Sequence, residues 1–214
     1  MHSHFGYFYR MMRVFFFCWI AVLVLWSCGS EQESLPILGE ATVVDGKKLY
    51  PAIADFDFVN QDGQHVTNAS FRDKIYIADF IFLSCPTICP VMTRELKKVY
   101  NAYQADDRVS IISHTIDPER DTIPRLKAYA EALGVSAPQW HFVTGNQDSI
   151  MNLAEKSYYA AANADSTAPG GFVHSGGFLL IDKNRNIRGV YNSLDSKETD
   201  RLIADIKRLL REQF

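Results

Sequence analysis

Two cysteines with three residues between them are the part of this sequence best suited to chemistry. Cys85 and Cys89 stand in the segment Ser84–Pro90 (SCPTICP), which directly follows a run of apolar residues. A strand followed by a helix is expected here, and the N–H groups at a helix start lower the pKa of a nearby thiol. Residues four apart on a helix share one side, so both sulfur atoms are expected on the same side. Such a pair can close as a disulfide or bind one soft metal ion, while the alternative is a pair of structural thiols or an inert disulfide.

Two sulfur ligands seldom complete a metal site, so a third ligand is sought among the histidines. His65 lies in an expected hairpin and His141 alternates with aromatic residues in a short strand, so both are interpreted as structural. His114 lies near the end of a buried strand and is the poorer of the two remaining candidates. His174 follows a glycine-rich loop and precedes an expected strand that begins near Gly177.

Sheet topology favours His174. The apolar runs Lys74–Leu83 and Arg108–Ile116 are joined by a helical segment, and a right-handed crossover makes two such strands parallel. Their carboxyl ends share one rim of the sheet, where ligands usually bind. If the hairpin that begins near Gly177 runs antiparallel to them, its first strand starts on that same rim. We therefore predict that His174 faces the two cysteines.

The remaining periodicity predicts an α/β fold. An N-terminal hairpin is followed by alternating strands and helices, then by a second hairpin and a final helix, which implies a mixed sheet with helices on both faces. The hairpins are expected over Asp55–Thr67 and Gly177–Tyr191, a short strand over Trp140–Val143, and the helices over Pro90–Tyr103, Ile123–Leu133, Ser149–Ser157 and Glu198–Arg211.

Composition and charge limit the possible functions. The 214 residues are 47% hydrophobic and 22% charged, which suits one folded domain with a tail. The 22 basic and 25 acidic residues give a net charge of −3, so the basic excess typical of a nucleic-acid binder is missing and no nucleic-acid partner is expected. Four cysteines are too few for a disulfide scaffold of this length.

The first residues are typical of an export signal. Arg13 precedes a 13-residue apolar run, Val14–Trp26, which as a helix spans about 20 Å and is shorter than the roughly 30 Å core of a bilayer. The run ends in Leu25-Trp26-Ser27-Cys28, which resembles the lipobox of bacterial lipoproteins. That resemblance implies cleavage before Cys28 and acylation of its sulfur.

The alternative is an uncleaved anchor, because Trp26 stands where the lipobox usually has a small residue. Both interpretations place the rest of the chain outside the cytoplasm on a membrane tether, at the periplasmic face of a bacterial membrane. We expect a signal peptide over residues 1–27, an acylated Cys28 with a flexible linker over residues 28–52, and the domain over residues 53–214. A short hairpin is expected within the linker at Asp45-Gly46.

Three spaced motifs resemble the Sco/SenC family. Phe80–Pro90 (FIFLSCPTICP) is similar to its CPxxCP strand–loop–helix segment, and Thr115–Thr122 (TIDPERDT) is similar to its DPxRDT segment. His174 ahead of Gly177–Asp182 (GFLLID) matches the family's histidine and strand. The motifs occur in the family's order, and the resemblance covers about residues 50–212.

This resemblance implies a thioredoxin-like fold and copper bound through Cys85, Cys89 and His174. It also implies a metallochaperone that delivers copper to the CuA-bearing subunit of cytochrome c oxidase, with an upstream copper donor or thiol reductant as a further partner. Many members have Asp at the positions of Thr87 and Val173. The loss of these negative charges is expected to weaken Cu(II) binding or to alter partner docking.

The three polar residues of the DPxRDT segment are expected to brace loops and cap a helix, with a docking role as the alternative. They are Asp117, Arg120 and Asp121.

Donor chemistry supports copper independently. Two thiolates and one imidazole suit Cu(I) and also tolerate Cu(II), whereas structural zinc normally takes four protein ligands. The alternative from another class is an extracytoplasmic thiol–disulfide reductase, which needs only Cys85 and Cys89. Thioredoxin-like reductases space their cysteines two apart and have no need of His174, so the pattern favours a metallochaperone over an enzyme. A thiol peroxidase is a third interpretation, for which no peroxide-activating group is evident beside Cys85.

Overall fold

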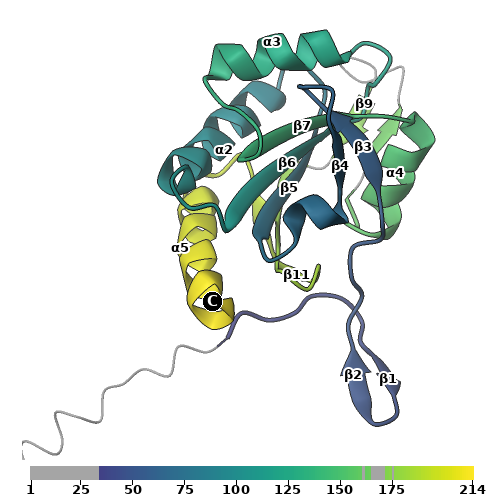
Figure 1. Ribbon diagram of the computed structural model, residues 1–214, viewed down its shortest axis with the longest axis vertical. Coiled ribbons are helices and arrows are strands. Elements are labelled where there is room, and N and C mark those ends of the chain that lie inside the picture. Colours follow the sequence, from purple (N-terminus) through teal and green to yellow (C-terminus); the bar gives the residue numbers. More distant parts are fainter. Residues whose placement is uncertain (1–33, 161, 165–171, 175) are drawn as a thin grey trace, which may run out of the picture. The chain divides into compact units, whose positions relative to one another are not determined.

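A seven-stranded mixed sheet forms the centre of the domain (Figure 1). The computed structural model describes residues 34–160, 162–164, 172–174 and 176–214, with 162–164 and 172–174 described as backbone. The strand order in the main sheet is β11-β10-β5-β6-β7-β3-β4. Its strands are β3 (Asp57–Asn60), β4 (His65–Thr67), β5 (Ile75–Ile81), β6 (Val109–Thr115), β7 (Trp140–Thr144), β10 (Gly177–Ile181) and β11 (Ile187–Asn192). Two small hairpins pair β1 (Thr42–Val44) with β2 (Lys47–Leu49) and β8 (Ala162–Ala164) with β9 (Phe172–His174).

The central strands β5, β6 and β7 are parallel, and every residue in them is buried. Strands with helices on both faces lose the alternation of polar and apolar residues, which explains the nearly continuous apolar runs in the sequence. The predicted buried strands and their parallel arrangement are confirmed.

Helices cover both faces of this sheet (Figure 1). On one face the ring of Trp140 lies 5.9 Å from that of Tyr100, and the Tyr103 hydroxyl donates to the carbonyl of Ile203 at 2.7 Å. On the other face Phe80 packs against Tyr158, with ring centroids 5.6 Å apart. The first face carries α2 (Cys89–Tyr103), α3 (Ile123–Leu133) and α5 (Ser196–Gln213), and the second carries α4 (Gln147–Lys156) and the short 3-10 helix η1 (Asn68–Phe71). The expected α/β fold is confirmed.

The late hairpin has the antiparallel orientation on which the predicted position of His174 depends. Strand β10 runs antiparallel to β5, with Leu179 opposite Ala78, and β11 runs antiparallel to β10. The start of β10 at Gly177 therefore lies beside the end of β5.

The chain ahead of the domain differs from the expected flexible linker over its described part. Leu35 and Ile53 are buried, and the Leu38 N–H donates to the carbonyl of Ile187 at 2.8 Å. The buried guanidinium of Arg188 donates to the carbonyl of Pro36 at 3.1 Å, so β11 holds this segment in place. The hairpin expected at Asp45-Gly46 is present as β1–β2.

The predicted signal peptide over residues 1–27 and the predicted lipidation site Cys28 lie outside the described residues. Within the described ranges, no helix combines the length and the apolar character that a membrane span requires.

Candidate metal centre

Cys85 and Cys89 lie at the junction between β5 and α2. The Cys85 N–H donates to the carbonyl of Phe82 at 3.1 Å, which turns the chain after the strand, and Cys89 is the first residue of α2. Both side chains are buried, with 8% and 5% of their surface exposed, and both are reduced thiols. Cys85 therefore precedes the helix, and the expected single helical turn containing both cysteines is wrong. The two side chains nevertheless meet, because Cys89 contributes hydrogen bonds to Cys85.

The pKa values of the two thiols are shifted in opposite directions by their surroundings. Burial raises the pKa of Cys85, but hydrogen bonds from the Cys89 and Thr87 backbones outweigh it and lower the net pKa below the ordinary thiol value. The Thr87 hydroxyl contributes as well, with its Oγ1 3.6 Å from the Cys85 Sγ. Burial raises the pKa of Cys89, and the neighbouring Cys85 and Asp79 raise it further. The predicted thiol with a lowered pKa is therefore Cys85 alone.

Residues after β6 hold the cysteine loop. The Asp121 carboxylate accepts hydrogen bonds from the Leu83 N–H at 3.0 Å and from the Thr115 hydroxyl at 2.6 Å. Arg125, on the first turns of α3, donates to the Ser84 hydroxyl at 3.0 Å and lies 3.4 Å from the Asp121 carboxylate. The residue directly before Cys85 is thereby tied to α3.

The bracing role expected for the DPxRDT segment is confirmed. Arg120 donates to the Asp117 carboxylate at 3.0 Å, and Asp121 supports the chain at Leu83. The expected helix cap is wrong, because the N-cap of α3 is Thr122 and its side chain makes no capping hydrogen bond within the described chain. Arg125 was not singled out from the sequence, although its position four residues after Asp121 is the spacing of a helical ion pair.

The backbone of His174 is brought close to the cysteine loop, while its side chain is outside the described part. His174 ends β9 and pairs with Ala162. Two residues later, a Cβ added to Gly176 would lie 3.7 Å from the Cδ1 of Ile88, which directly precedes Cys89. Two residues span at most about 7 Å, so the His174 backbone lies within that distance of Gly176 and therefore near this loop. Its role as a ligand stays a prediction.

The other three histidines of the domain have structural surroundings. His65 contacts Asp57 at 2.7 Å on the surface, and the buried His141 contacts the Asn60 amide at 3.2 Å, which confirms their structural interpretation. His114 is completely buried, and neither ring nitrogen has a hydrogen-bond partner among the described residues. Four aromatic rings surround His114, those of Phe56, Phe58, Phe80 and Tyr158. Among the described side chains, no group of three or more His, Cys, Asp and Glu forms a metal site.

A buried carboxyl group near the cysteines was not singled out from the sequence. Asp79 lies in β5 with 1% of its surface exposed, and burial raises its pKa to about 7. Its carboxylate accepts a hydrogen bond from the Ser113 hydroxyl at 2.5 Å, and Ser113 accepts one from the Trp140 indole at 2.9 Å. An aspartate inside an apolar strand was the available signal, because unpaired buried acids are rare.

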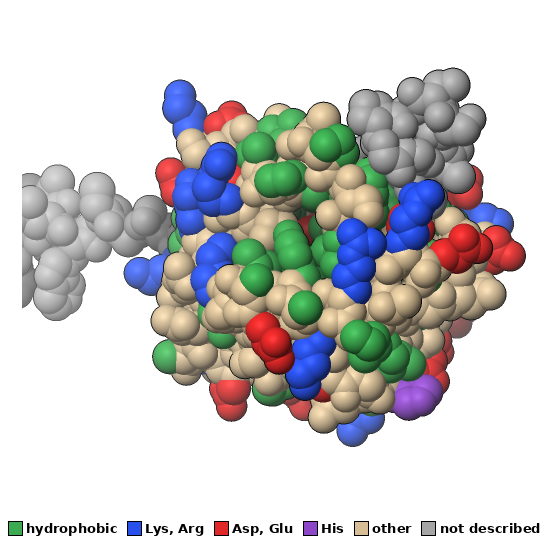
Figure 2. Space-filling model, turned by 90° about the horizontal axis from the view of Figure 1, so that it is seen from above, with side chains coloured by type: hydrophobic (Ala, Val, Ile, Leu, Met, Phe, Trp, Pro, Cys, Tyr) green, Lys and Arg blue, Asp and Glu red, His purple; other side chains and the backbone are tan. Residues whose placement is uncertain are grey.

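The end of the domain that carries α3 presents a mixed surface. Figure 2 views the molecule from above the orientation of Figure 1: hydrophobic side chains gather near the centre of this face, with Lys and Arg side chains around them. Arg120 and Arg125 contact the loops beside the cysteines, so the candidate centre belongs to this end. An apolar centre within a charged surrounding is typical of a protein-docking surface.

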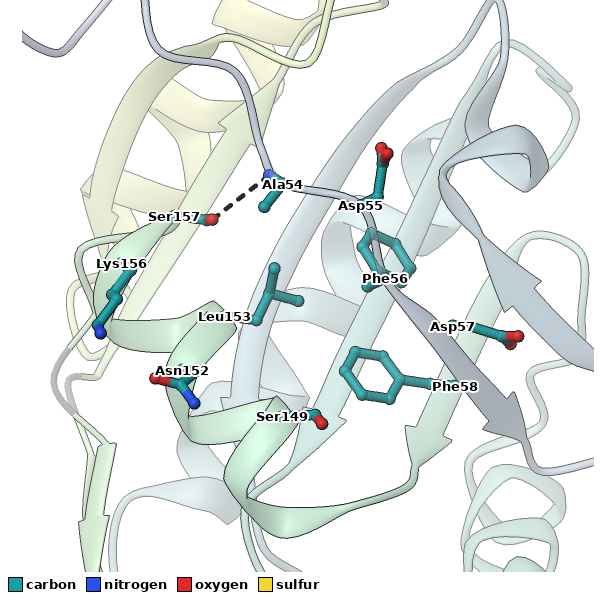
Figure 3. A pocket seen from close by; sticks show the side chains of 10 residues that line it. All are labelled: Ala54, Asp55, Phe56, Asp57, Phe58, Ser149, Asn152, Leu153, Lys156 and Ser157. Atoms are coloured by element: carbon teal, nitrogen blue, oxygen red, sulfur yellow. Dashed lines mark hydrogen bonds between the residues drawn. The ribbon is translucent and has the colours of Figure 1, made fainter.

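A separate cavity of about 390 Å³ lies between α4 and the chain that enters β3 (Figure 3). The stacked rings of Phe56 and Phe58, 5.6 Å apart, point into it, and the Ala54 N–H donates to the Ser157 hydroxyl at 3.3 Å at one end. Neither cysteine is among the described residues that line it, so this cavity is not part of the candidate centre.

Comparisons with known proteins agree with this geometry. The chain matches the SCO1/SenC family model over residues 45–211. It is 32% identical over 187 residues to a SCO1 protein homolog of Bacillus subtilis, covering 86% of this chain and 90% of that protein.

Solved structures give the same result. The crystal structure of a SCO1/SenC family lipoprotein from Bacillus anthracis matches with a TM-score of 0.68 and 26% identity, covering 74% of this chain and 95% of that one. The structure of Bradyrhizobium japonicum ScoI with copper bound matches with a TM-score of 0.62 and 27% identity, covering 74% and 99%. The paired cysteines after a central strand, the bracing loop after β6 and these matches lead to one conclusion: the chain belongs to the SCO1/SenC family.

Proposed function

We propose that this protein is a membrane-tethered copper metallochaperone that binds one copper ion through Cys85, Cys89 and His174. Its role is to deliver copper to, or otherwise mature, the CuA site of cytochrome c oxidase. The observation that carries the proposal is the hydrogen-bond contact of Cys85 and Cys89 at the start of α2. Gly176 lies beside Ile88 of the same loop, where an added Cβ would be 3.7 Å from the Ile88 Cδ1. Gly176 brings the segment of His174 to the same loop.

The donor set fits copper. The Cys85 thiolate is stabilised by hydrogen bonds at the start of α2, and thiolate is the form that binds a metal. Two thiolates and one imidazole suit Cu(I) and tolerate Cu(II). The copper-bound ScoI structure supports the same choice of metal.

The position of the centre suits transfer. Cys85 lies in a loop at the rim of the sheet, and the surrounding surface combines apolar and cationic side chains (Figure 2). A partner that docks there can offer its own ligands to the copper ion without unfolding the donor. The Cys28 tether would keep this exchange outside the cytoplasm, and the matching Bacillus anthracis lipoprotein supports it.

A transfer experiment tests the proposal. One portion of the reduced protein is loaded with one equivalent of Cu(I) and another with one equivalent of Cu(II). Both are mixed, two donors per acceptor, with the copper-free CuA domain of an oxidase subunit whose cysteines are reduced. The purple CuA state formally holds one Cu(I) and one Cu(II), so this mixture supplies both ions without a further oxidant. The expected result is the purple CuA absorption with a matching loss of copper from the donor, and no transfer from Cys85→Ser. A CuA site that fills at the same rate from Cys85→Ser as from the wild type would overturn the proposal.

A thiol–disulfide reductase is the second candidate, and the opposite pKa shifts of the two cysteines favour it. A lowered pKa at Cys85 and a raised pKa at Cys89 match the roles of an attacking thiol and its resolving partner. His174→Ala separates the candidates, because the reductase needs only the cysteines. Retained reduction of an oxidised CuA domain with lost copper delivery would show that both activities reside in the chain.

A further inference from the structure

One end of the domain carries an unusual share of exposed apolar surface. Of the seven large hydrophobic side chains exposed in the described chain, four lie at the lower end in Figure 1. These are Val43 (68% exposed), Val44 (50%) and Leu49 (53%) in the β1–β2 hairpin and Phe214 (51%) after α5. All six hairpin strand residues are exposed, and a two-stranded hairpin without cover is only marginally stable in water.

Cations accompany these apolar groups. The ring of Phe214 lies under two of them, with the Lys183 Nζ at 5.1 Å and the Arg108 guanidinium at 5.5 Å. An apolar groove of about 580 Å³ beside Phe214, lined by Tyr103, Ile203 and Leu210, also carries Lys207 and Arg211. The hairpin adds Lys47 and Lys48. The acidic side chains at this end include Glu40, Asp45 and Asp107, as well as two paired ones: Asp106 pairs with Arg108 at 2.7 Å and Glu212 with Arg188 at 2.5 Å.

The described chain also begins at this end. The Leu35 N–H donates to the Glu212 carboxylate at 3.2 Å, which places the start of the chain beside the last turn of α5. Ser34 lies only six positions after Cys28, and six extended residues span at most about 22 Å. A chain anchored at or before Cys28 therefore holds this end near the membrane.

We propose that the β1–β2 hairpin and the C-terminal end of α5 form a lipid-contact surface that rests on the headgroup layer of an anionic bilayer. Exposed aliphatic and aromatic side chains with lysines and arginines beside them are the combination found at membrane interfaces. Val43, Val44, Leu49 and Phe214 enter the interface, and the cations contact phosphate groups. The proposal rests on the membrane tether of the proposed function.

This contact orients the candidate metal centre away from the bilayer. The Ile75 N–H donates to the carbonyl of Arg108, so the start of β5 lies at the lipid-contact end. Cys85 follows the other end of β5, whose seven residues span about 23 Å. The copper ligands are thereby presented to proteins that project from the membrane.

Hydrogen exchange of the full chain tests the inference. The protein is reconstituted into vesicles of equimolar phosphatidylcholine and phosphatidylglycerol and compared with the same chain in a neutral detergent. Amide exchange over residues 42–49 and 208–214 is expected to slow severalfold in vesicles, with no change over residues 83–89. The double variants Val43→Asp/Val44→Asp and Lys207→Glu/Arg211→Glu are expected to lose this protection.

Matched controls separate lipid contact from other effects. Val190→Asp changes an equally exposed valine on β11, and Lys197→Glu changes an exposed lysine at the other end of α5; both are expected to keep the protection. Equal exchange of residues 42–49 in vesicles and detergent would overturn the inference, and so would protection of residues 83–89 instead. Protection that rises with protein concentration in detergent would show that a second copy covers the hairpin, which also overturns it.

The two proposals fail separately. Each variant is first checked for wild-type copper stoichiometry, which shows that its domain is folded. A variant of the hairpin or of α5 that loses protection by lipid but still binds copper tests the lipid-contact surface and leaves the metal centre unaffected. Cys85→Ser that loses copper binding but keeps slow amide exchange over residues 42–49 in vesicles tests the metal centre and leaves the lipid-contact surface unaffected.

Discussion

Arg125 on α3 donates a hydrogen bond to the hydroxyl of Ser84, and the two atoms are 3.0 Å apart. The same guanidinium lies 3.4 Å from the Asp121 carboxylate, which in turn accepts the Leu83 N–H. The loop ahead of Cys85 is thus positioned by a helix that is separate in sequence from both cysteines.

Arg125→Ala is expected to weaken copper binding more than it weakens the fold. Its guanidinium is 41% exposed and therefore partly screened by solvent, which limits what its ion pair contributes to the free energy of unfolding. Groups that orient metal ligands commonly change affinity by about 10- to 100-fold. Competition titration of copper and urea unfolding measure the two effects, with the exposed Arg94→Ala as the control. Equal copper affinity in both variants would show that the loop needs no such brace.

Oxidation is expected to abolish copper binding. Cys85 and Cys89 are in hydrogen-bond contact, so a mild oxidant should join them within one chain, and a disulfide leaves no thiolate to bind the metal. Mass spectrometry confirms the loss of two hydrogens, and a copper titration of that sample follows. Tight Cu(I) binding by fully oxidised protein would contradict the two-thiolate centre.

His114 is expected to destabilise the fold in acid. Burial lowers the pKa of His114 from 6.5 to about 3, so below pH 6.5 the unfolded chain takes up a proton that the folded chain refuses. Stability is therefore lost as the pH falls from 6.5 to 3, at about 1.4 kcal/mol per pH unit. His114→Phe removes the group that takes up this proton, so the stability of the variant relative to wild type should rise as the pH falls. Urea unfolding at several pH values checks this, with Leu202→Ala, a buried residue of α5 on the other face of the sheet, as a variant whose difference from wild type stays constant. A constant difference for His114→Phe would contradict the prediction.

Asp79 is expected to give the opposite pH dependence, with stability that is lost as the pH rises. Burial raises the pKa of Asp79 from 3.8 to about 7, so the folded state keeps a proton that the unfolded state releases. Stability from this group is present below pH 3.8 and is lost as the pH rises to 7. Asp79→Asn should therefore gain stability relative to wild type over this range, on the order of 4 kcal/mol in total. Thermal unfolding from pH 4 to pH 7 measures it. A gain that is independent of pH would place the carboxyl in a more polar site than its burial indicates.

The fold could be predicted largely from periodicity and topology. The apolar runs that became β5 and β6 have lost the two-residue alternation, which is typical of strands buried on both faces. The handedness of the crossover then placed Cys85 and the start of β10 on one rim. Apolar runs can be read from a single sequence, and the handedness of crossovers is a general property of protein chains, so neither feature required knowledge of long-range contacts.

Contacts between distant segments could not be predicted in the same way. Nothing in the residues around Pro36 indicates that the guanidinium of Arg188 binds its carbonyl, so the segment was expected to be a flexible linker. The bond from Arg125 to Ser84 likewise depends on how α3 packs beside the loop. The expected helical turn from Cys85 to Cys89 failed because a four-residue spacing alone does not fix where a helix begins; α2 begins at Cys89.

Copper titration of reduced His174→Ala against wild type is the sharpest test of the three-ligand copper centre, with His65→Ala as the control because His65 lies on the surface beside Asp57. Absorption spectroscopy follows thiolate-to-Cu(II) charge transfer, and competition with a Cu(I) chelator gives the affinity. We expect one copper ion per wild-type chain, a changed spectrum with at least tenfold weaker binding for His174→Ala, and wild-type spectrum and affinity for His65→Ala. Wild-type affinity and spectrum in His174→Ala would contradict the three-ligand centre.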